Sequence, residues 1–255
     1  TLINAVIEAR ILPVSSMTAC TAAVSEVSYS PDDAYEATVE FITHDEWREE
    51  VEVLAADIAD QEQDFTDDAS TEPAQRPLVS RSARDKLKAI YGLNEHEIEW
   101  RRVKGLVEPT SIREALSRGQ THIRVNDLAE FANELAKYLS AKESFWPIVK
   151  AVRIKGPFAP LANGAKLVDL PGVNDPNAAR EKVTHDDIKS SRFVWMIFNI
   201  KRAITKDIHG IMQSDDFLRQ VIMDGREHSL TLIGTASDDV DTDTAWEEFG
   251  LAEDA

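Results

Sequence analysis

The stretch that decides the fold runs from Ala165 to Arg180 and reads AKLVDLPGVNDPNAAR. Leu167 and Val168 have the apolar character of a strand that would end at Asp169. Asp-Leu-Pro-Gly then has two interpretations. It makes a good turn, because proline presets φ and glycine tolerates positive φ. It is also typical of a nucleotide switch, in which the aspartate supports Mg²⁺ and the glycine amide meets a terminal phosphate.

Composition limits the classes of function. The 255 residues suffice for one large α/β domain or two small ones, and a hydrophobic content of 43% supports a sizeable core. A net charge of −18 argues against binding to nucleic acid or to an anionic membrane, so we expect neither contact from these residues. The one cysteine, Cys20, excludes an internal disulfide and suits an intracellular compartment, cytoplasmic or nuclear.

The first half of the chain predicts two strands and a run of helices. Residues 1–10 resemble a helix whose beginning has been cut off, so we expect the chain to be a fragment. Alternation over 22–29 and 35–42, with Ser-Pro-Asp-Asp between, predicts a β-hairpin. Residues 44–145 are expected to form an all-helical insertion, with helices at 45–61, 82–91, 94–103, 111–118 (capped by Thr110 or Ser111) and 126–141 (capped by Asn126).

Strands return in the second half. We expect them at 148–154, before Asp169, at 193–200 and at 230–234, with helices at 178–190 and 215–223 between them. Such alternation indicates an α/β fold with an open, mostly parallel sheet. Ligands bind such sheets beyond the carboxyl ends of the strands, and both Asp169 and Asp238 follow strands at this end. This placement favours the switch interpretation over the plain turn.

These features together resemble the GTPase domain of the dynamin-like superfamily, in particular its nuclear GTPases and their fungal relatives. The resemblance is carried by Thr1–Ala5 (TLINA), Leu12-Pro13, Ala19–Ala22 (ACTA), Phe145–Pro147 (FWP), Leu167–Gly172 (LVDLPG) with Asp175, Asn177 and Arg180, and Thr235–Asp239 (TASDD). It covers nearly the whole chain. It implies a P-loop NTPase fold, with a GTPase domain over 1–43 and 146–255, truncated at both ends, and an insertion over 44–145.

The resemblance also implies roles around the phosphates of GTP. Thr21 matches the switch threonine, which helps to hold Mg²⁺ and the attacking water, and Thr18 is the alternative. Asp169 matches the residue that supports Mg²⁺ through a water. Pro171 lies in the same nucleotide-binding loop, and Gly172 matches the amide that meets the γ-phosphate.

A second set of implied roles concerns the base. Thr235 and Asp238 match the motif in which the carboxylate accepts hydrogen bonds from guanine. Ala236 stands where the family has a lysine along the base plane, which implies weaker guanine affinity or relaxed selectivity. Asp239 and Asp241 lie close enough in sequence to compete for the role of Asp238.

Two functions stay open. In the family, Leu-Ile-Asn follows directly on the P-loop, so we expect the Gly-Lys-Ser to lie just before Thr1 and to be missing from this chain. An intact parent would bind GTP and hydrolyse it to GDP and phosphate with Mg²⁺, and the resemblance implies a homodimer through the GTPase domain. The alternative is a catalytically inactive GTPase-fold scaffold, with the insertion as its interaction surface.

Overall fold

The computed structural model describes residues 2–13, 23–64, 78–93, 98, 103, 105–170, 191–199 and 229–236. The chain divides into two compact units, Thr1–His185 and Asp186–Ala255. Each unit is described by itself. The helices expected at 178–190 and 215–223, and nearly all of the one at 94–103, lie outside the described residues.

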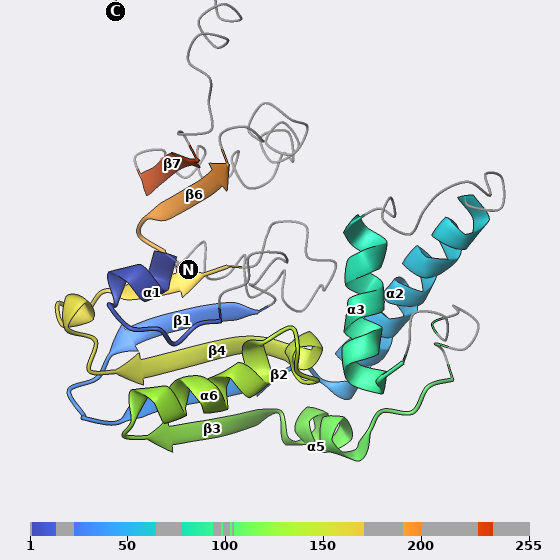
Figure 1. Cartoon of the computed structure of the whole chain (residues 1–255), viewed down its shortest axis with the longest axis horizontal. Coiled ribbons are helices and arrows are strands. Elements are labelled where there is room, and N and C mark those ends of the chain that lie inside the picture. Colours follow the sequence, from blue (N-terminus) through green and yellow to red (C-terminus); the bar gives the residue numbers. More distant parts are fainter. Residues whose placement is uncertain are drawn as a thin grey trace, which may run out of the picture. The chain divides into compact units, whose positions relative to one another are not determined.

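The first unit contains a five-stranded sheet in the order β3-β2-β4-β1-β5. Its strands are β1 (Val24–Tyr29), β2 (Tyr35–Phe41), β3 (Gln120–Val125), β4 (Val149–Gly156) and β5 (Lys166–Asp169). β1 and β4 run parallel, while β1–β5, β2–β3 and β2–β4 are antiparallel. Figure 1 shows β4 lying between β1 and β2.

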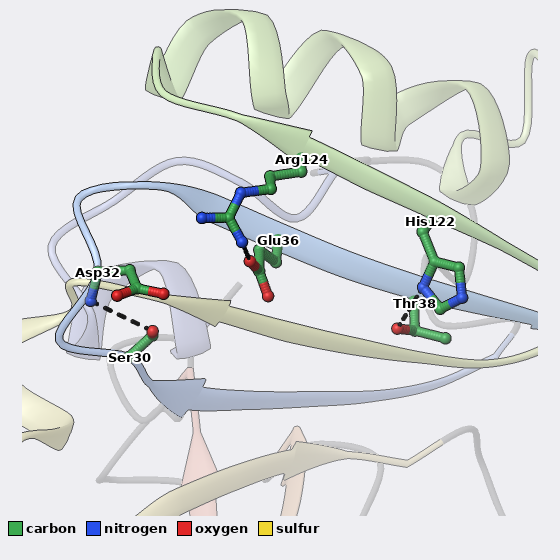
Figure 2. A network of polar contacts seen from close by, with 6 residues as sticks. All are labelled: Ser30, Asp32, Glu36, Thr38, His122 and Arg124. Atoms are coloured by element: carbon green, nitrogen blue, oxygen red, sulfur yellow. Dashed lines mark hydrogen bonds and ion pairs between the residues drawn. The ribbon is translucent and has the colours of Figure 1, made fainter.

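One face of this sheet is apolar and the other is polar. Val27, Val39 and Val152 are fully buried in the core, as expected where apolar residues alternate with polar ones. The opposite face carries cross-strand ion pairs: Arg124 with Glu36, Arg153 with Glu40, and Lys166 with Glu26. On the same face, Thr38 Oγ1 and His122 Nδ1 lie 3.0 Å apart (Figure 2).

Helices pack around the sheet. They are α1 (Leu2–Val6), α2 (His44–Asp64), α3 (Leu78–Tyr91), α5 (Thr110–Arg118) and α6 (Leu128–Leu139). Single 3₁₀ turns, η3 (Trp146–Ile148) and η4 (Ala159–Leu161), flank β4. α2 and α3 lie side by side, and α6 packs on β3 and β2 (Figure 1). Ile3 and Ile7, at helical spacing, bring the N-terminal residues into the same core.

The hairpin prediction is wrong, although both of its strands exist. β1 pairs with β4 and β5, whereas β2 pairs with β3 and β4, so the two strands never pair with each other. The Ser-Pro-Asp-Asp turn connects them, but β4 is inserted between them in the sheet. Local alternation predicts a strand and does not choose its partner.

The expected insertion is not entirely helical. Residues 120–125 form β3, an edge strand that pairs with β2, so this part of the insertion belongs to the sheet. Two predicted caps are also wrong. Asp127, not Asn126, caps α6, with its carboxylate accepting from the amide of Glu130 at 2.8 Å. Pro109 takes the cap position of α5 and makes no side-chain bond there.

The second unit is described by two strands. β6 (Val194–Asn199) and β7 (Leu230–Thr235) pair in parallel, with Asn199 opposite Thr235 at their carboxyl ends. Both lie where the sequence predicts a strand, although Trp195 and Ile197 of β6 are exposed, at 57% and 47%. The α/β class is thus confirmed, and the described pairings are parallel for β1–β4 and β6–β7 and antiparallel for the other three.

Candidate functional site

The strand β5 ends at Asp169, as the sequence predicts. Leu167 packs against the core, and Lys166 pairs with Glu26 of β1 across 2.9 Å, so the strand is held on both faces of the sheet. Asp169 itself is half-buried. The residues that follow, 171–190, lie outside the described part of the chain.

The start of β1 lies beside the end of β5. In the antiparallel register between the two strands, Ser25 is the partner of Asp169. Ser25 is buried, and its hydroxyl lies 3.5 Å from the carbonyl oxygen of Ala23. Because antiparallel strands run in opposite directions, the chain enters β1 at the same end of the sheet at which it leaves β5. Thr21 lies shortly before Ala23 in sequence, outside the described residues.

The strand β7 of the second unit ends at Thr235, which is exposed. Ala236 follows with a φ of 57°. This left-handed conformation costs an L-residue about 1–2 kcal/mol and is usual for glycine. Residues other than glycine keep it where the surrounding structure requires it, often at functional sites. Ala236 is therefore a left-handed residue directly after Thr235, at the position where the base-reading motif is expected.

The six predicted site residues divide into two groups. Asp169 and Thr235 are described, and each lies at the carboxyl end of a strand. The other four lie outside the described residues: Thr21, Pro171, Gly172 and Asp238. Since Asp169 and Thr235 belong to separate units, each is placed only within its own unit.

The carboxylate of Asp169, at the end of β5, can be compared with the donors that Mg²⁺ takes in proteins. Within the described ranges, no group of three or more histidine, cysteine, aspartate or glutamate side chains could hold a metal ion. Mg²⁺ usually keeps several waters and takes one or two carboxylates together with phosphate oxygens. A single aspartate at a strand end, such as Asp169, fits this donor set.

Shifted pKa values occur in the insertion. Burial raises the pKa of the Tyr91 hydroxyl, and the negative charge of Glu108 adds to the effect. A hydrogen bond to Glu134 raises the pKa of Lys137. Burial opposes ionisation of Glu46, but hydrogen bonds from the Thr43 amide and from Lys150 outweigh it and lower its pKa. These shifts follow from local packing and pairing.

Sequence reasoning missed the role of Asn4. Its side chain makes three hydrogen bonds to the backbone of Ile11 and Leu12, just before the segment that leads to Thr21. A signal was present in the sequence, because a polar amide stands among the apolar residues Leu2, Ile3, Val6 and Ile7. In the sequence alone, Asn4 is only one of the residues that carry the resemblance.

Among the described helices, none combines the length and the apolar character that a membrane span needs.

Known proteins with similar sequences include nuclear GTPases. The nuclear GTPase SLIP-GC of Mus musculus is 27% identical over 226 residues, which cover 84% of this chain and 28% of that protein. The Homo sapiens protein of the same name is 28% identical over 223 residues, 82% of this chain and 27% of that protein. The chain thus spans little more than a quarter of the length of these relatives.

Solved structures with a similar fold include a bacterial dynamin. A chain from an oligomerised bacterial dynamin pair, described as sensing and tethering membranes, matches with a TM-score of 0.54 over 98% of this chain and 27% of that one. Its sequence identity is 20%, so this likeness shows the fold alone. The sequence pattern of the dynamin family matches residues 1–216, most of the chain. The chain therefore belongs to the dynamin family.

Proposed function

We propose that these residues are the nucleotide-binding and catalytic part of a GTPase that binds GTP and hydrolyses it to GDP and phosphate. One observation carries the proposal. The register of Ser25 with Asp169 joins the start of β1 to the end of β5. The chain therefore enters β1 and leaves β5 at the same end of the sheet, and in the sequence Thr21 precedes β1 while Pro171 and Gly172 follow β5. Ligands of α/β proteins bind beyond the carboxyl ends of strands, and Asp169 lies at the carboxyl end of β5.

Each residue near the phosphates would have its own role in hydrolysis. Asp169 would orient a water on Mg²⁺, and Thr21 would hold both the metal and the attacking water. Gly172 would offer its backbone amide to the γ-phosphate, and Pro171 would shape that loop. Bound Mg²⁺ would neutralise charge on the phosphate oxygens. Catalysis of this kind comes from positioning and electrostatic stabilisation, with no covalent intermediate.

At the base, Asp238 would accept hydrogen bonds from N1–H and the exocyclic amine of guanine, and Thr235 would end the strand that supports it. Ala236 lacks the aliphatic stem that a lysine would lay along the base plane. The proposal therefore includes a weaker preference for guanine than a lysine would give. A homodimer through the GTPase domain and an intracellular location, nuclear or cytoplasmic, also belong to it. The nuclear relatives support the location, and the homodimer follows from the resemblance to the dynamin-like superfamily.

The test uses the full-length protein. We expect Asp169→Asn to lower kcat by about 100-fold or more, because the amide loses the negative charge that holds the hydrated metal. Asp32→Asn is the matched control. Asp32 is exposed in the β1–β2 turn, and the hydrogen bond it makes to Ser30 Oγ comes from its backbone amide, which the substitution keeps. Phosphate release measures turnover. Normal turnover in Asp169→Asn would show that Asp169 does not support the metal.

The role of Asp238 at the base is tested separately, in the same full-length protein. In Asp238→Asn, the side-chain amide can donate to the carbonyl that xanthine carries in place of the guanine amine. We expect preference to move from guanine toward xanthine nucleotides, while Asp239→Asn leaves it unchanged. An unaltered preference for GTP in Asp238→Asn would contradict the assignment.

The second candidate function is an inactive GTPase-fold scaffold. One observation favours it: Ala236 replaces the lysine that the family motif carries beside the base. A full-length protein that binds neither GDP nor GTP would establish this alternative and exclude the GTPase.

A further inference from the structure

Asn4 binds the backbone that leads into the segment carrying Thr21. Its Nδ2 donates to the carbonyl oxygen of Leu12 at 2.8 Å. Its Oδ1 accepts from the amide of Ile11 at 3.2 Å and from the amide of Leu12 at 3.0 Å. One side chain thus uses both its donor and its acceptor on two consecutive residues.

The end of α1 brings these partners together. The backbone carbonyl of Asn4 accepts from the amide of Ala9 at 3.2 Å, and Glu8 adopts a φ of 55°. A left-handed residue at this position ends a helix and reverses the chain. Ile11 and Leu12 return to the helix, where both are buried in the core. Asn4 is therefore the point at which this reversed chain is hydrogen-bonded to α1.

Both ends of the segment 14–22 are consequently held by described residues. Its first end follows Pro13, next to the bonds of Asn4. Its second end enters β1, where Ser25 is paired with Asp169. We propose that Asn4 is a positioning residue for GTP hydrolysis, which sets the point from which the chain departs toward Thr21. This inference rests on the proposed GTPase function.

An apolar side chain cannot replace this amide. Removing it takes the partner from two N–H groups and one carbonyl of the buried residues Ile11 and Leu12, and such groups are costly when unsatisfied. GDP lacks the γ-phosphate that Thr21 would sense. Removing the amide of Asn4 should therefore slow the hydrolysis of GTP more than it weakens the binding of GDP.

The experiment compares three variants of the full-length protein. Asn4→Leu is close in size and makes none of the bonds, while Asn4→Asp keeps the two acceptor bonds and loses the donor bond. Asn163→Leu is the control, because Asn163 is exposed and accepts a single backbone bond, from Ala165, before the start of β5. The measurements are kcat and KM for GTP, the Kd for GDP, Tm, and hydrogen exchange at the amides of Ile11 and Leu12.

We expect Asn4→Leu to lower kcat by about tenfold or more while the Kd for GDP stays within about twofold. Exchange at the two amides should become faster, and Asn4→Asp should recover most of the rate. Asn163→Leu should behave as the unaltered protein.

Three results would overturn the inference. An unchanged kcat in Asn4→Leu would do so while leaving the proposed GTPase intact. Equal losses of GDP and GTP binding, together with a lower Tm, would show that Asn4 serves only the stability of the fold. An unaltered protein that fails to hydrolyse GTP would overturn the proposed function and this inference with it.

Discussion

At the scale of single residues, the N-terminus of α2 shows how local chemistry sets a boundary. Thr43 Oγ1 accepts from the amide of Glu46 at 3.2 Å, and Glu46 Oε2 accepts from the amide of Thr43 at 2.7 Å. This reciprocal pair is a capping box. Lys150 of β4 donates to the other carboxylate oxygen at 3.2 Å, so Glu46 also ties the helix to the sheet.

This geometry predicts a pH dependence. The pKa of Glu46 lies below its usual value of 4.5, because its hydrogen bonds outweigh the effect of burial. Its contribution is therefore complete above pH 4.5 and declines as the pH falls through the lower folded-state pKa. We expect Glu46→Ala to reduce the free energy of unfolding by about 1 kcal/mol near neutral pH.

Urea denaturation across pH checks this prediction, and the difference between Glu46→Ala and the unaltered protein should shrink in acid. Glu49→Ala, at an exposed position of the same helix, is the control and should change little at any pH. A difference that stays constant down to strong acid would show that the ionised carboxylate contributes nothing.

At the scale of elements, α2 and α3 are joined by a buried ion pair. Lys86 Nζ lies 2.7 Å from Glu50 Oε1, and the two side chains are only 4% and 2% exposed. Charges this deep are tolerated because an opposite charge lies beside each, so losing one residue of the pair takes that opposite charge away from a buried group. The pair thus makes the packing of the two helices depend on both residues.

We expect Lys86→Met to destabilise the protein by about 3–5 kcal/mol, whereas the double variant Lys86→Met/Glu50→Leu should recover most of that loss. Chemical denaturation of both single variants and the double variant gives the coupling energy. The control is Arg48→Met, which breaks an exposed pair with Asp45 and should cost less than about 1 kcal/mol. Additive losses in the double variant would refute the coupling.

At the scale of the whole molecule, the question is which residues hold the phosphates of GTP. The 255 residues lack the glycine-rich loop and lysine that cradle the phosphates of GTP in P-loop proteins. Asp169 and the segment around Thr21 can act on a γ-phosphate only when those groups are present.

Residues 1–255 alone should therefore show no phosphate release above background, while a longer form that includes a P-loop before Thr1 should turn over GTP. The two forms are compared at equal concentration with Mg²⁺ and with equal GTP. Turnover by residues 1–255 alone would mean that the phosphates are held in some other way.

Much of the element pattern was predictable from the sequence. The strands ending at Asp169 and Thr235 and the helices α2, α3, α5 and α6 all lie close to their predicted positions, because apolar periodicity is a local property. The caps were less predictable, since Asn126 and Asp127 are both good capping residues and only the backbone geometry selects Asp127. The short strand β3 was missed inside a predominantly helical region.

The sequence by itself determined the α/β class, the family, and the aspartate at the end of β5. Only the tertiary structure decided which strands pair: β4 separates β1 from β2, and β1 lies against β5 so that Ser25 meets Asp169. It alone also revealed the bonds of Asn4 and the burial of Lys86 with Glu50. The physical reason is that strand character is a short-range property, whereas pairing and burial depend on packing between residues far apart in the chain.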